Sequence, residues 1–399
     1  MKFSNLSNNL LIQKVLFPIS LLFSIAGVNL ANSSYVNANS FNINDSKYSD
    51  LNSHIFTSKC IDLCLNKQNN VSPPEAATKF LYTLKGQHNY DVDSLAFTPD
   101  GQTLISGSIY NKIHVWDLKT RKVRQVFNAG KDGVNTVAIS PDGSLLAAAG
   151  GFAQLDTDTT IKVWNLKTGR MIFKFKGHNQ GINSLQFSAD GKNIISASSD
   201  KTIKFWNLQN GRLIRTLKGH KNWIMALTIS PDGKTLASAG GAYEMDSDTA
   251  IRLWDIKTGR LLRTFTGTKE AIGVLTFSPD GKTLVSSAGK LQTNTIINFW
   301  DVNSGKIIGN IPQKAVSLIF SKDSKNLLTV SSSYAVDLWN ISNKKKVKTL
   351  VEPITLVSDQ DIGRIYLSSA VLNPDRKTLV IGEGGVLSGF EIGVRQINF

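Results

Sequence analysis

The chain has 399 residues, of which 41% are hydrophobic and 19% charged, with 31 Gly and 10 Pro. This is ordinary globular composition, so collagen-like, coiled-coil and wholly disordered chains are excluded. Lys and Arg number 45 against 30 Asp and Glu, a net charge of +15 that favours anionic surroundings without selecting one. Two Cys cannot staple a fold of this size, and no Cys/His cluster has zinc spacing, so packing must hold the core.

The first 31 residues have the pattern of a targeting segment. Lys2 and Lys14 precede an apolar run over residues 15–30, and small residues follow from Ala31. The run is about 16 residues long, shorter than the roughly 20 that a membrane-spanning helix needs. We therefore predict a secretory signal peptide over 1–31, with an uncleaved membrane anchor as the alternative. The protein is then exported to a periplasmic or extracellular space, or tethered by its N-terminus, rather than cytoplasmic.

Residues 32–78 are rich in Asn and Ser and lack periodicity, which predicts a disordered linker. Cys60 and Cys64 lie inside it and have no His partners for a metal. In an exported protein they could form a local disulfide, and two free thiols are the alternative.

A segment of similar sequence then recurs six times. Each copy ends in a Trp that is followed by Asp or Asn: Trp116, Trp164, Trp206, Trp254, Trp300 and Trp339. An apolar strand and a turn such as Ser-Pro-Asp-Gly precede each Trp, and a strand with small residues follows the turn. Alternating apolar residues bounded by Asp-Gly turns are typical of β-hairpins, and no helical pattern occurs between residues 80 and 399. The fold should be all β, with one indole per unit filling the gap between neighbouring sheets.

These repeats resemble the WD-repeat β-propeller family, in which Gly-His stands near the start of each repeat and Trp-Asp at its end. Gly177-His178 and Gly219-His220 match the first signature. The resemblance implies blades of four-stranded antiparallel sheet, two of them tied by hydrogen-bonded tetrads. The residues of the tetrads would be His178, Ser196, Asp200 and Trp206 in one blade, and His220, Ser238, Asp248 and Trp254 in the next.

Other units lack parts of this pattern. Gly130 and Gly267 are not followed by His, and the sixth unit has neither residue, so these blades are predicted to be locally softer. Residues 367–392 read as a degraded seventh unit with Phe390-Glu391 in place of Trp-Asp. The N-terminal strand 79–84 resembles an outermost strand and would complete that last blade. We therefore predict a seven-bladed propeller over residues 79–399.

The sequence shows no catalytic site, metal site or cofactor motif. No His lies beside a paired carboxylate or an activated Ser, and no Gly-rich phosphate loop occurs. The Asp-x-Asp pairs at 156–158 and 246–248 lack the further ligands of a calcium loop.

Insertions between the second and third strands of three blades are the candidate partner-binding elements. In the family's geometry they share a face with the Gly-His loops, and exposed aromatic and Met side chains are typical protein-interface anchors. The predicted partner-binding residues are Phe152, Leu155, Trp223, Tyr243, Met245 and Leu291. The alternative is that each insertion only caps its own blade.

The predicted function is a non-enzymatic protein-interaction scaffold. One alternative is an envelope hydrolase or lyase acting in the central funnel. Another is weak docking on anionic surfaces through a ring of Lys and Arg in the turns after the Trp strands, although outer-strand cations such as Arg212 and Arg260 can also serve to block edge pairing. No specific nucleic-acid binding is expected, and membrane contact only through an uncleaved N-terminus.

Overall fold

A computed structural model describes residues 78–84, 92–108, 111–130, 133–151, 158–241, 248–288, 296–331, 335–352, 366–384 and 392–397. The chain divides into two compact units, and every described strand belongs to the unit formed by Pro74–Lys290 and Asn294–Phe399. The predicted signal segment, the linker and the Cys60–Cys64 pair lie outside the described residues and stay predictions. Within the described ranges no helix is long and apolar enough to cross a membrane.

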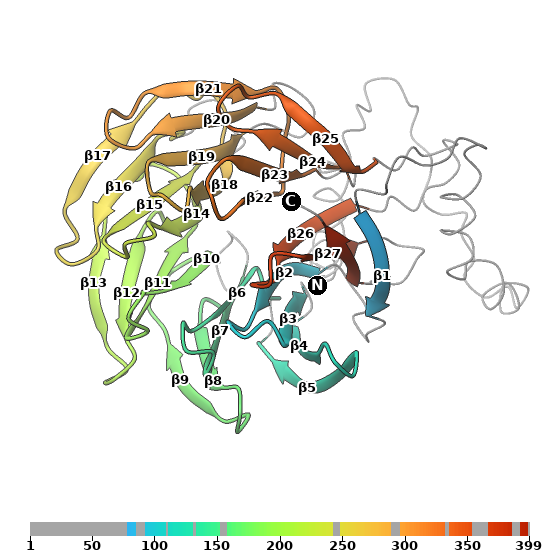
Figure 1. The fold of residues 1–399 in the computed structure, drawn as a ribbon. Helices are drawn as coiled ribbons and strands as arrows, with labels where there is room; N and C mark the ends of the chain where they lie inside the picture. The colour runs from blue at the N-terminus through green and yellow to red at the C-terminus, as the bar shows by residue number, and fades with distance from the viewer. Residues whose placement is uncertain are drawn as a thin grey trace, which may run out of the picture. The chain divides into compact units, whose positions relative to one another are not determined.

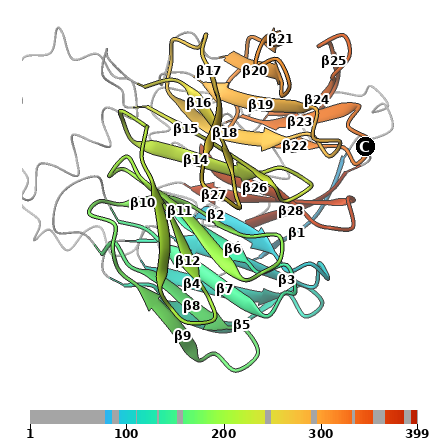
Figure 2. The same ribbon diagram turned by 90° about the vertical axis from the view of Figure 1, so that its left-hand side faces the viewer.

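The strands form seven four-stranded antiparallel sheets, which we number as blades in chain order (Figures 1 and 2). Blade 1 is β2 (Val92–Phe97), β3 (Thr103–Ser108), β4 (Lys112–Asp117) and β5 (Lys122–Asn128). Blade 2 is β6 (Thr136–Ile139), β7 (Leu145–Ala149), β8 (Ile161–Asn165) and β9 (Met171–Phe175). Blade 3 is β10 (Ile182–Phe187), β11 (Asn193–Ser198), β12 (Ile203–Asn207) and β13 (Leu213–Leu217). Blade 4 is β14 (Ile224–Ile229), β15 (Thr235–Gly240), β16 (Ile251–Asp255) and β17 (Leu261–Phe265).

The remaining three blades have the same order. Blade 5 is β18 (Ile272–Phe277), β19 (Thr283–Ala288), β20 (Ile296–Asp301) and β21 (Ile307–Ile311). Blade 6 is β22 (Ser317–Phe320), β23 (Asn326–Val330), β24 (Val336–Asn340) and β25 (Lys346–Val351). Blade 7 is β26 (Tyr366–Leu372), β27 (Thr378–Gly384), β28 (Ile392–Ile397) and, from the other end of the chain, β1 (Thr78–Leu84).

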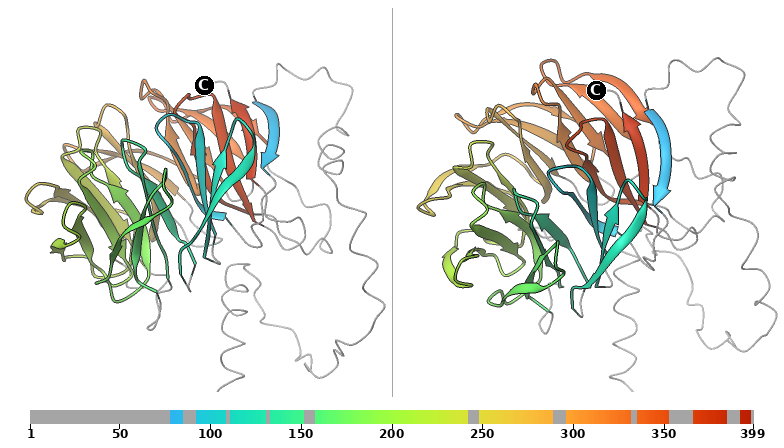
Figure 3. Two further views of the ribbon diagram at one scale, coloured as in Figure 1. Left: turned by 90° about the horizontal axis from the view of Figure 1, so that it is seen from below. Right: turned by 60° about the horizontal axis from the view of Figure 1, so that its bottom comes forward.

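The blades form a closed ring. The first strand of every blade contacts the first strands of both neighbours, and β26 of blade 7 contacts β2 of blade 1. Strand β1 pairs antiparallel with β28, from Thr78 opposite Ile397 to Leu84 opposite Ile392. Figures 1 and 3 show the blue β1 at the edge of the red sheet. The predicted all-β, seven-bladed propeller closed by the N-terminal strand is therefore confirmed.

Indole rings fill six of the seven gaps between blades, because each Trp packs on the blade before its own. Trp116 is fully buried among residues of blades 7 and 1, and Trp300 is fully buried against blade 4. A Phe from the preceding outer strand often lies beside the indole, as Phe175 does at a ring-centroid distance of 5.3 Å from Trp206. Trp339 is only partly buried against blade 5. The indoles thus join sheets that could not bury both faces alone.

The seventh blade differs from the expected alignment. Each Trp lies opposite the second residue of its neighbouring strand, as Trp206 lies opposite Ile194, and in blade 7 the corresponding pair is Arg395 and Leu379. The prediction that Phe390-Glu391 holds the Trp-Asp position is therefore wrong: a longer connection displaces the third strand to Ile392–Ile397. Phe390 and Glu391 lie outside the described residues. The cluster between blades 6 and 7 consequently contains aliphatic side chains and no indole.

The outer strand of each blade carries a register shift beside the Trp or Arg395 position. Such a β-bulge twists an edge strand and hinders pairing with another chain. The large exposed apolar side chains of the described residues all lie on these outer strands: Phe80, Leu81, Val126, Met171, Ile172, Leu213, Ile214, Leu261, Leu262, Ile307, Ile308 and Val347. The outer wall of the ring, formed by these strands, therefore exposes apolar side chains, while its bulged backbone is poorly suited to pair with a strand of another chain.

The indole packing predicts a graded loss of stability. Trp300→Ala should lower the free energy of unfolding by roughly 3–5 kcal/mol, because it empties a fully buried site. Trp339→Ala should lower it less, since Trp339 is only partly buried. Denaturant unfolding measures both, with Ile308→Ala on the exposed outer wall as the control. A Trp300→Ala loss no larger than that of the control would contradict the packing argument.

Candidate functional site

At one end of each blade, the segment that leads into the first strand lies beside the connection between the second and third strands. In blade 3, His178 precedes the inner strand, and its Nδ1 lies 2.8 Å from Oδ2 of Asp200 in the connection between β11 and β12. In blade 4, His220 and Asp248 repeat this contact at 3.2 Å. We call this end of the ring the loop face; it is formed by the connections 176–181, 199–202 and 218–223 and their equivalents. Insertions between second and third strands therefore start and end on the loop face.

Of the predicted partner-binding residues, only Trp223 is described. It is half-buried and directly precedes β14. The other five lie outside the described residues and stay predictions: Phe152, Leu155, Tyr243, Met245 and Leu291. The structure does describe the residues that flank their insertions.

Both ends of the blade 4 insertion are fixed. At its start, Gly241 N donates to the Trp223 backbone oxygen at 3.0 Å, and a Cβ on Gly240 would lie 2.0 Å from that oxygen. At its end, Asp248 accepts from Arg252 Nη1 at 2.8 Å in a buried ion pair. Only glycine fits at position 240, so the insertion leaves the blade directly beside Trp223.

The blade 2 insertion is held in the same way. Asn135 Nδ2 donates to the Gly151 backbone oxygen at 2.8 Å where the insertion starts. Asp158, where it ends, accepts from Lys162 Nζ at 2.7 Å, and Lys162 is almost fully buried. Loops that leave and return through buried anchors are well placed to present side chains to a partner.

The structure brings together the four residues that the family resemblance assigns to blade 3. Trp206 Nε1 donates to Ser196 Oγ at 2.9 Å, Ser196 Oγ lies 2.7 Å from His178 Nε2, and His178 Nδ1 contacts Asp200. Ser-His-Asp is also the order of a hydrolase triad. Here Ser196 is fully buried and its oxygen accepts the indole N–H, so it holds the blade together and no substrate can reach it.

Blade 4 repeats this chain and adds a cation. Trp254 Nε1 donates to Ser238 Oγ at 2.8 Å, and Ser238 Oγ lies 2.8 Å from His220 Nε2. Arg252 Nη1 lies within 3.0 Å of both Asp248 carboxylate oxygens and 2.9 Å from His220 Nδ1. The guanidinium therefore shares the carboxylate with the imidazole.

Blades without the histidine use other side chains, which sequence reasoning missed. In blade 6, Trp339 Nε1 donates to Thr329 Oγ1 at 3.0 Å, and Thr329 Oγ1 lies 3.4 Å from Gln313 Oε1. Gln313 Nε2 in turn donates to Asp337 Oδ2 at 3.1 Å. In blade 2, Lys162 supplies the donor to Asp158. The expectation that such blades are softer stays a prediction.

A signal for these replacements exists in the sequence. The residue two positions before each Trp is polar although its strand is buried: His114, Lys162, Lys204, Arg252, Asn298 and Asp337. A buried polar side chain needs a partner, and Lys162, Arg252 and Asp337 of this column do take part in the networks of blades 2, 4 and 6.

In the tetrads, burial and hydrogen bonding shift the pKa values of the His and Asp side chains in opposite directions. Burial lowers the pKa of His178 and of His220, and their hydrogen bonds to Asp200 and Asp248 only partly offset it. Burial lowers the pKa of His114 to about 4. Burial alone would raise the pKa of Asp200, but hydrogen bonds from His178 and Thr202 hold it well below its usual range. The two tetrads are thus set as neutral imidazole and carboxylate.

Among the described residues no three His, Cys, Asp or Glu side chains gather as a metal ion would require. Asp158 and Asp248, the described members of the two Asp-x-Asp pairs, face Lys162 and Arg252 instead.

A closed ring of seven repeated four-stranded blades, with hydrogen-bonded polar chains inside several of them, defines a β-propeller of the repeat type. The model of the WD domain, G-beta repeat, matches residues 78–117, 121–165, 169–207, 211–255 and 259–301, which is more than half of the chain. The chain belongs to the WD40 repeat family. Propellers of this family are generally non-enzymatic scaffolds.

Two relatives share a short stretch of this sequence. The small ribosomal subunit protein RACK1y of Oryza sativa subsp. japonica is 36% identical over 77 residues, which cover 17% of this chain and 23% of the relative. Superkiller complex protein 8 of Dictyostelium discoideum is 36% identical over 76 residues, covering 19% and 25%. The chain thus spans about a quarter of the length of these relatives.

The lowered histidine pKa values predict a loss of stability in mild acid. The unfolded chain binds protons near the ordinary pKa of 6.5, whereas the folded chain resists protonation at His114, His178 and His220. Stability should be complete above about pH 6.5 and fall as the pH drops below it. Urea unfolding between pH 8 and pH 5 measures this. The slope should be shallower in His178→Gln, and a free energy of unfolding that is constant over this range would contradict the account.

The hydrogen-bond network of blade 6 predicts that Gln313 stabilises the fold. Gln313→Ala should lower the free energy of unfolding by about 1–2 kcal/mol, because Asp337 and Thr329 each lose a partner. Thermal or urea unfolding measures this, with Gln209→Ala on an exposed turn as the control. If the two variants were equally stable, Gln313 would have no structural role.

Proposed function

We propose that this protein is a non-enzymatic scaffold that binds a protein partner through the insertions of its loop face. One observation carries the proposal: the insertions of blades 2 and 4 leave and return through buried anchors. Ion pairs of Lys162 with Asp158 and of Arg252 with Asp248 fix the returning ends. Loops fixed in this way lose less entropy on binding than free loops.

The residue types of the insertions support the same proposal. Phe152, Tyr243 and Met245 are side chains enriched in the cores of protein interfaces. Trp223 adds a half-buried indole beside the point where the blade 4 insertion begins. A contiguous set of such anchors would form the centre of a binding surface, with the surrounding polar loops as its rim.

The enzyme alternative draws no support from the described residues. Their most enzyme-like constellation, Ser196 with His178 and Asp200, lies inside blade 3 with its hydroxyl fully buried. A funnel hydrolase would need exposed groups that converge on a substrate.

The outer wall offers a second candidate surface. The outer strands β1, β5, β9, β13, β17, β21 and β25 contain several Lys and Arg and no acidic residue. Cations framing exposed pairs such as Leu213 and Ile214 are suited to an anionic surface with some apolar character. The bulges disfavour strand addition, so contact there would use side chains.

The loop-face proposal predicts that Phe152→Ala, Trp223→Ala and Tyr243→Ala together abolish partner binding. The expected loss is at least a hundred-fold in affinity, as removal of several hot-spot aromatics implies. A partner captured from the native compartment and identified by mass would be purified and titrated against wild type and variant. The melting temperature should change little at the Trp223 substitution, because Trp223 is half-buried and lies outside the core clusters of the described residues.

A matched variant of the outer wall controls this experiment. Ile172→Ser, Ile214→Ser and Leu262→Ser remove three exposed apolar side chains far from the loop-face anchors. Wild-type affinity in this control is the expected result. If binding were instead lost in the control and weakened steeply with added salt, the outer wall would be the docking surface.

A further inference from the structure

The turns joining first and second strands lie at the end of the blades away from the loop face, and two of them differ from the rest. In blades 1 to 5 the turn has Pro or Ala before its Asp and Gly after it. The Gly occupies the left-handed region, as Gly281 does with φ of 70°. Blade 6 has Lys322 in place of the Pro, and blade 7 has Arg376 in place of the Gly, with φ of 60°.

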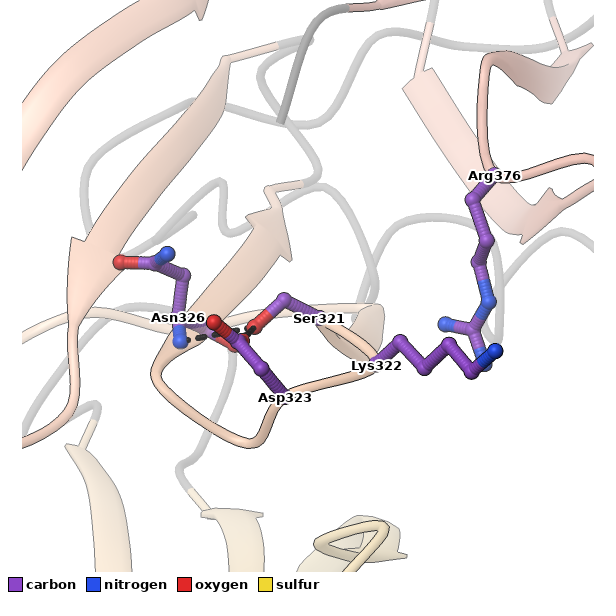
Figure 4. Close-up of a pocket in the computed structure, with 5 residues that line it drawn as sticks. All are labelled: Ser321, Lys322, Asp323, Asn326 and Arg376. Atoms are coloured by element: carbon purple, nitrogen blue, oxygen red, sulfur yellow. Dashed lines mark hydrogen bonds between the residues drawn. The ribbon is translucent and has the colours of Figure 1, made fainter.

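The two departures face one pocket. A hollow of about 250 Å³ lies between the turns of blades 6 and 7, lined by Ser321, Lys322, Asp323, Asn326 and Arg376 (Figure 4). Figure 4 shows the Lys322 side chain extending toward the Arg376 guanidinium. Arg376 Nη1 donates to the Phe320 backbone oxygen at 2.8 Å, which fixes the guanidinium across the boundary between the blades.

The carboxylates of Asp323, which lines the pocket, and of Asp375 accept hydrogen bonds from their own turns. Asp323 Oδ1 accepts from Ser321 Oγ at 2.6 Å and from Lys325 N at 3.0 Å. Asp375 accepts from Lys377 N at 2.7 Å and from Thr378 Oγ1 at 2.9 Å. Across the described ranges neither Lys322 nor Arg376 forms an ion pair.

Two neighbouring cations without a carboxylate partner repel each other, and an anion between them removes that repulsion. A guanidinium presents a planar fork of donors and an ammonium a compact charge, a combination suited to the several oxygens of a phosphate group. We propose that the pocket between the turns of blades 6 and 7 binds a phosphate group, held by Lys322 and Arg376.

The position of this pocket gives the ligand a structural effect. Blades 6 and 7 are the pair whose interface lacks an indole, because Arg395 stands at the Trp position. A phosphate held from both turns would join these two blades at their turn end. Binding should therefore slow hydrogen exchange in β22 and β26.

Calorimetric titration of the full chain at low ionic strength tests the proposal. The probes are inorganic phosphate, glycerol 3-phosphate as a lipid-headgroup analogue, and acetate at matched ionic strength. Inorganic phosphate should bind at least ten-fold more tightly than acetate. Tighter binding of glycerol 3-phosphate than of inorganic phosphate would assign the phosphate to a headgroup-like ester, and the reverse order to free phosphate.

The decisive variant is Lys322→Pro with Arg376→Gly, which installs the turn residues that blades 4 and 5 already use. It should fold and lose at least ten-fold in phosphate affinity, and phosphate should no longer slow exchange in β26. Lys234→Ala with Lys282→Ala removes two cations from the equivalent turns and should bind as wild type. Lys322→Gln with Arg376→Gln gives the same comparison if the first variant does not fold. Equal phosphate binding by wild type and pocket variant, or equal binding of phosphate and acetate, would overturn the proposal.

Discussion

The structure depends on the indoles that pack six of the seven blades against the blade before them. In five of these six blades a hydroxyl of the same blade accepts the indole N–H, as in the 2.8 Å contact of Trp116 Nε1 with Ser106 Oγ, while the ring face packs on the neighbour. One side chain therefore fixes both the inside of a blade and the gap between two blades. Because the ring is closed, each indole also limits how far every other pair of blades can separate.

Much of this architecture was predictable from the sequence, because the same residue pattern recurs in six units. The Trp column, the Asp-Gly turns and the small residues of the second strands predicted repeated all-β units, and the family resemblance that they carry implied four-stranded blades. Even the place of β1 followed from the likeness of Phe80–Leu84 to the outer strand that contains Leu213–Leu217. Repetition compensates for the weakness of any single strand signal.

What escaped prediction depends on distances between residues far apart in sequence. Gln313 replaces a histidine because its amide reaches Asp337 across the blade, and no local pattern reports that reach. Arg395 could not be aligned, since the Trp that marks the other third strands is missing and a longer connection shifts the strand. The loop-face residues Phe152 and Tyr243 stay predictions, because insertions have no repeated counterpart from which to read their shape.

The two proposed binding sites lie at opposite ends of one closed ring. Binding at the loop face costs less entropy because the insertions are held at both ends. The pocket between the turns of blades 6 and 7 is preformed because Arg376 is hydrogen-bonded to the Phe320 backbone oxygen. Neither needs the blades to move. The same scaffold can therefore carry two independent binding events.

The pairing of Thr78 with Ile397 has a consequence for biosynthesis. Strand β1 is synthesised long before its partner β28, so the circle cannot shut until Ile397 has emerged from the ribosome. Until then β1 has no strand to pair with and is prone to aggregate, and blade 7 lacks its outer strand. The growing chain must therefore keep β1 from pairing elsewhere until β28 is available.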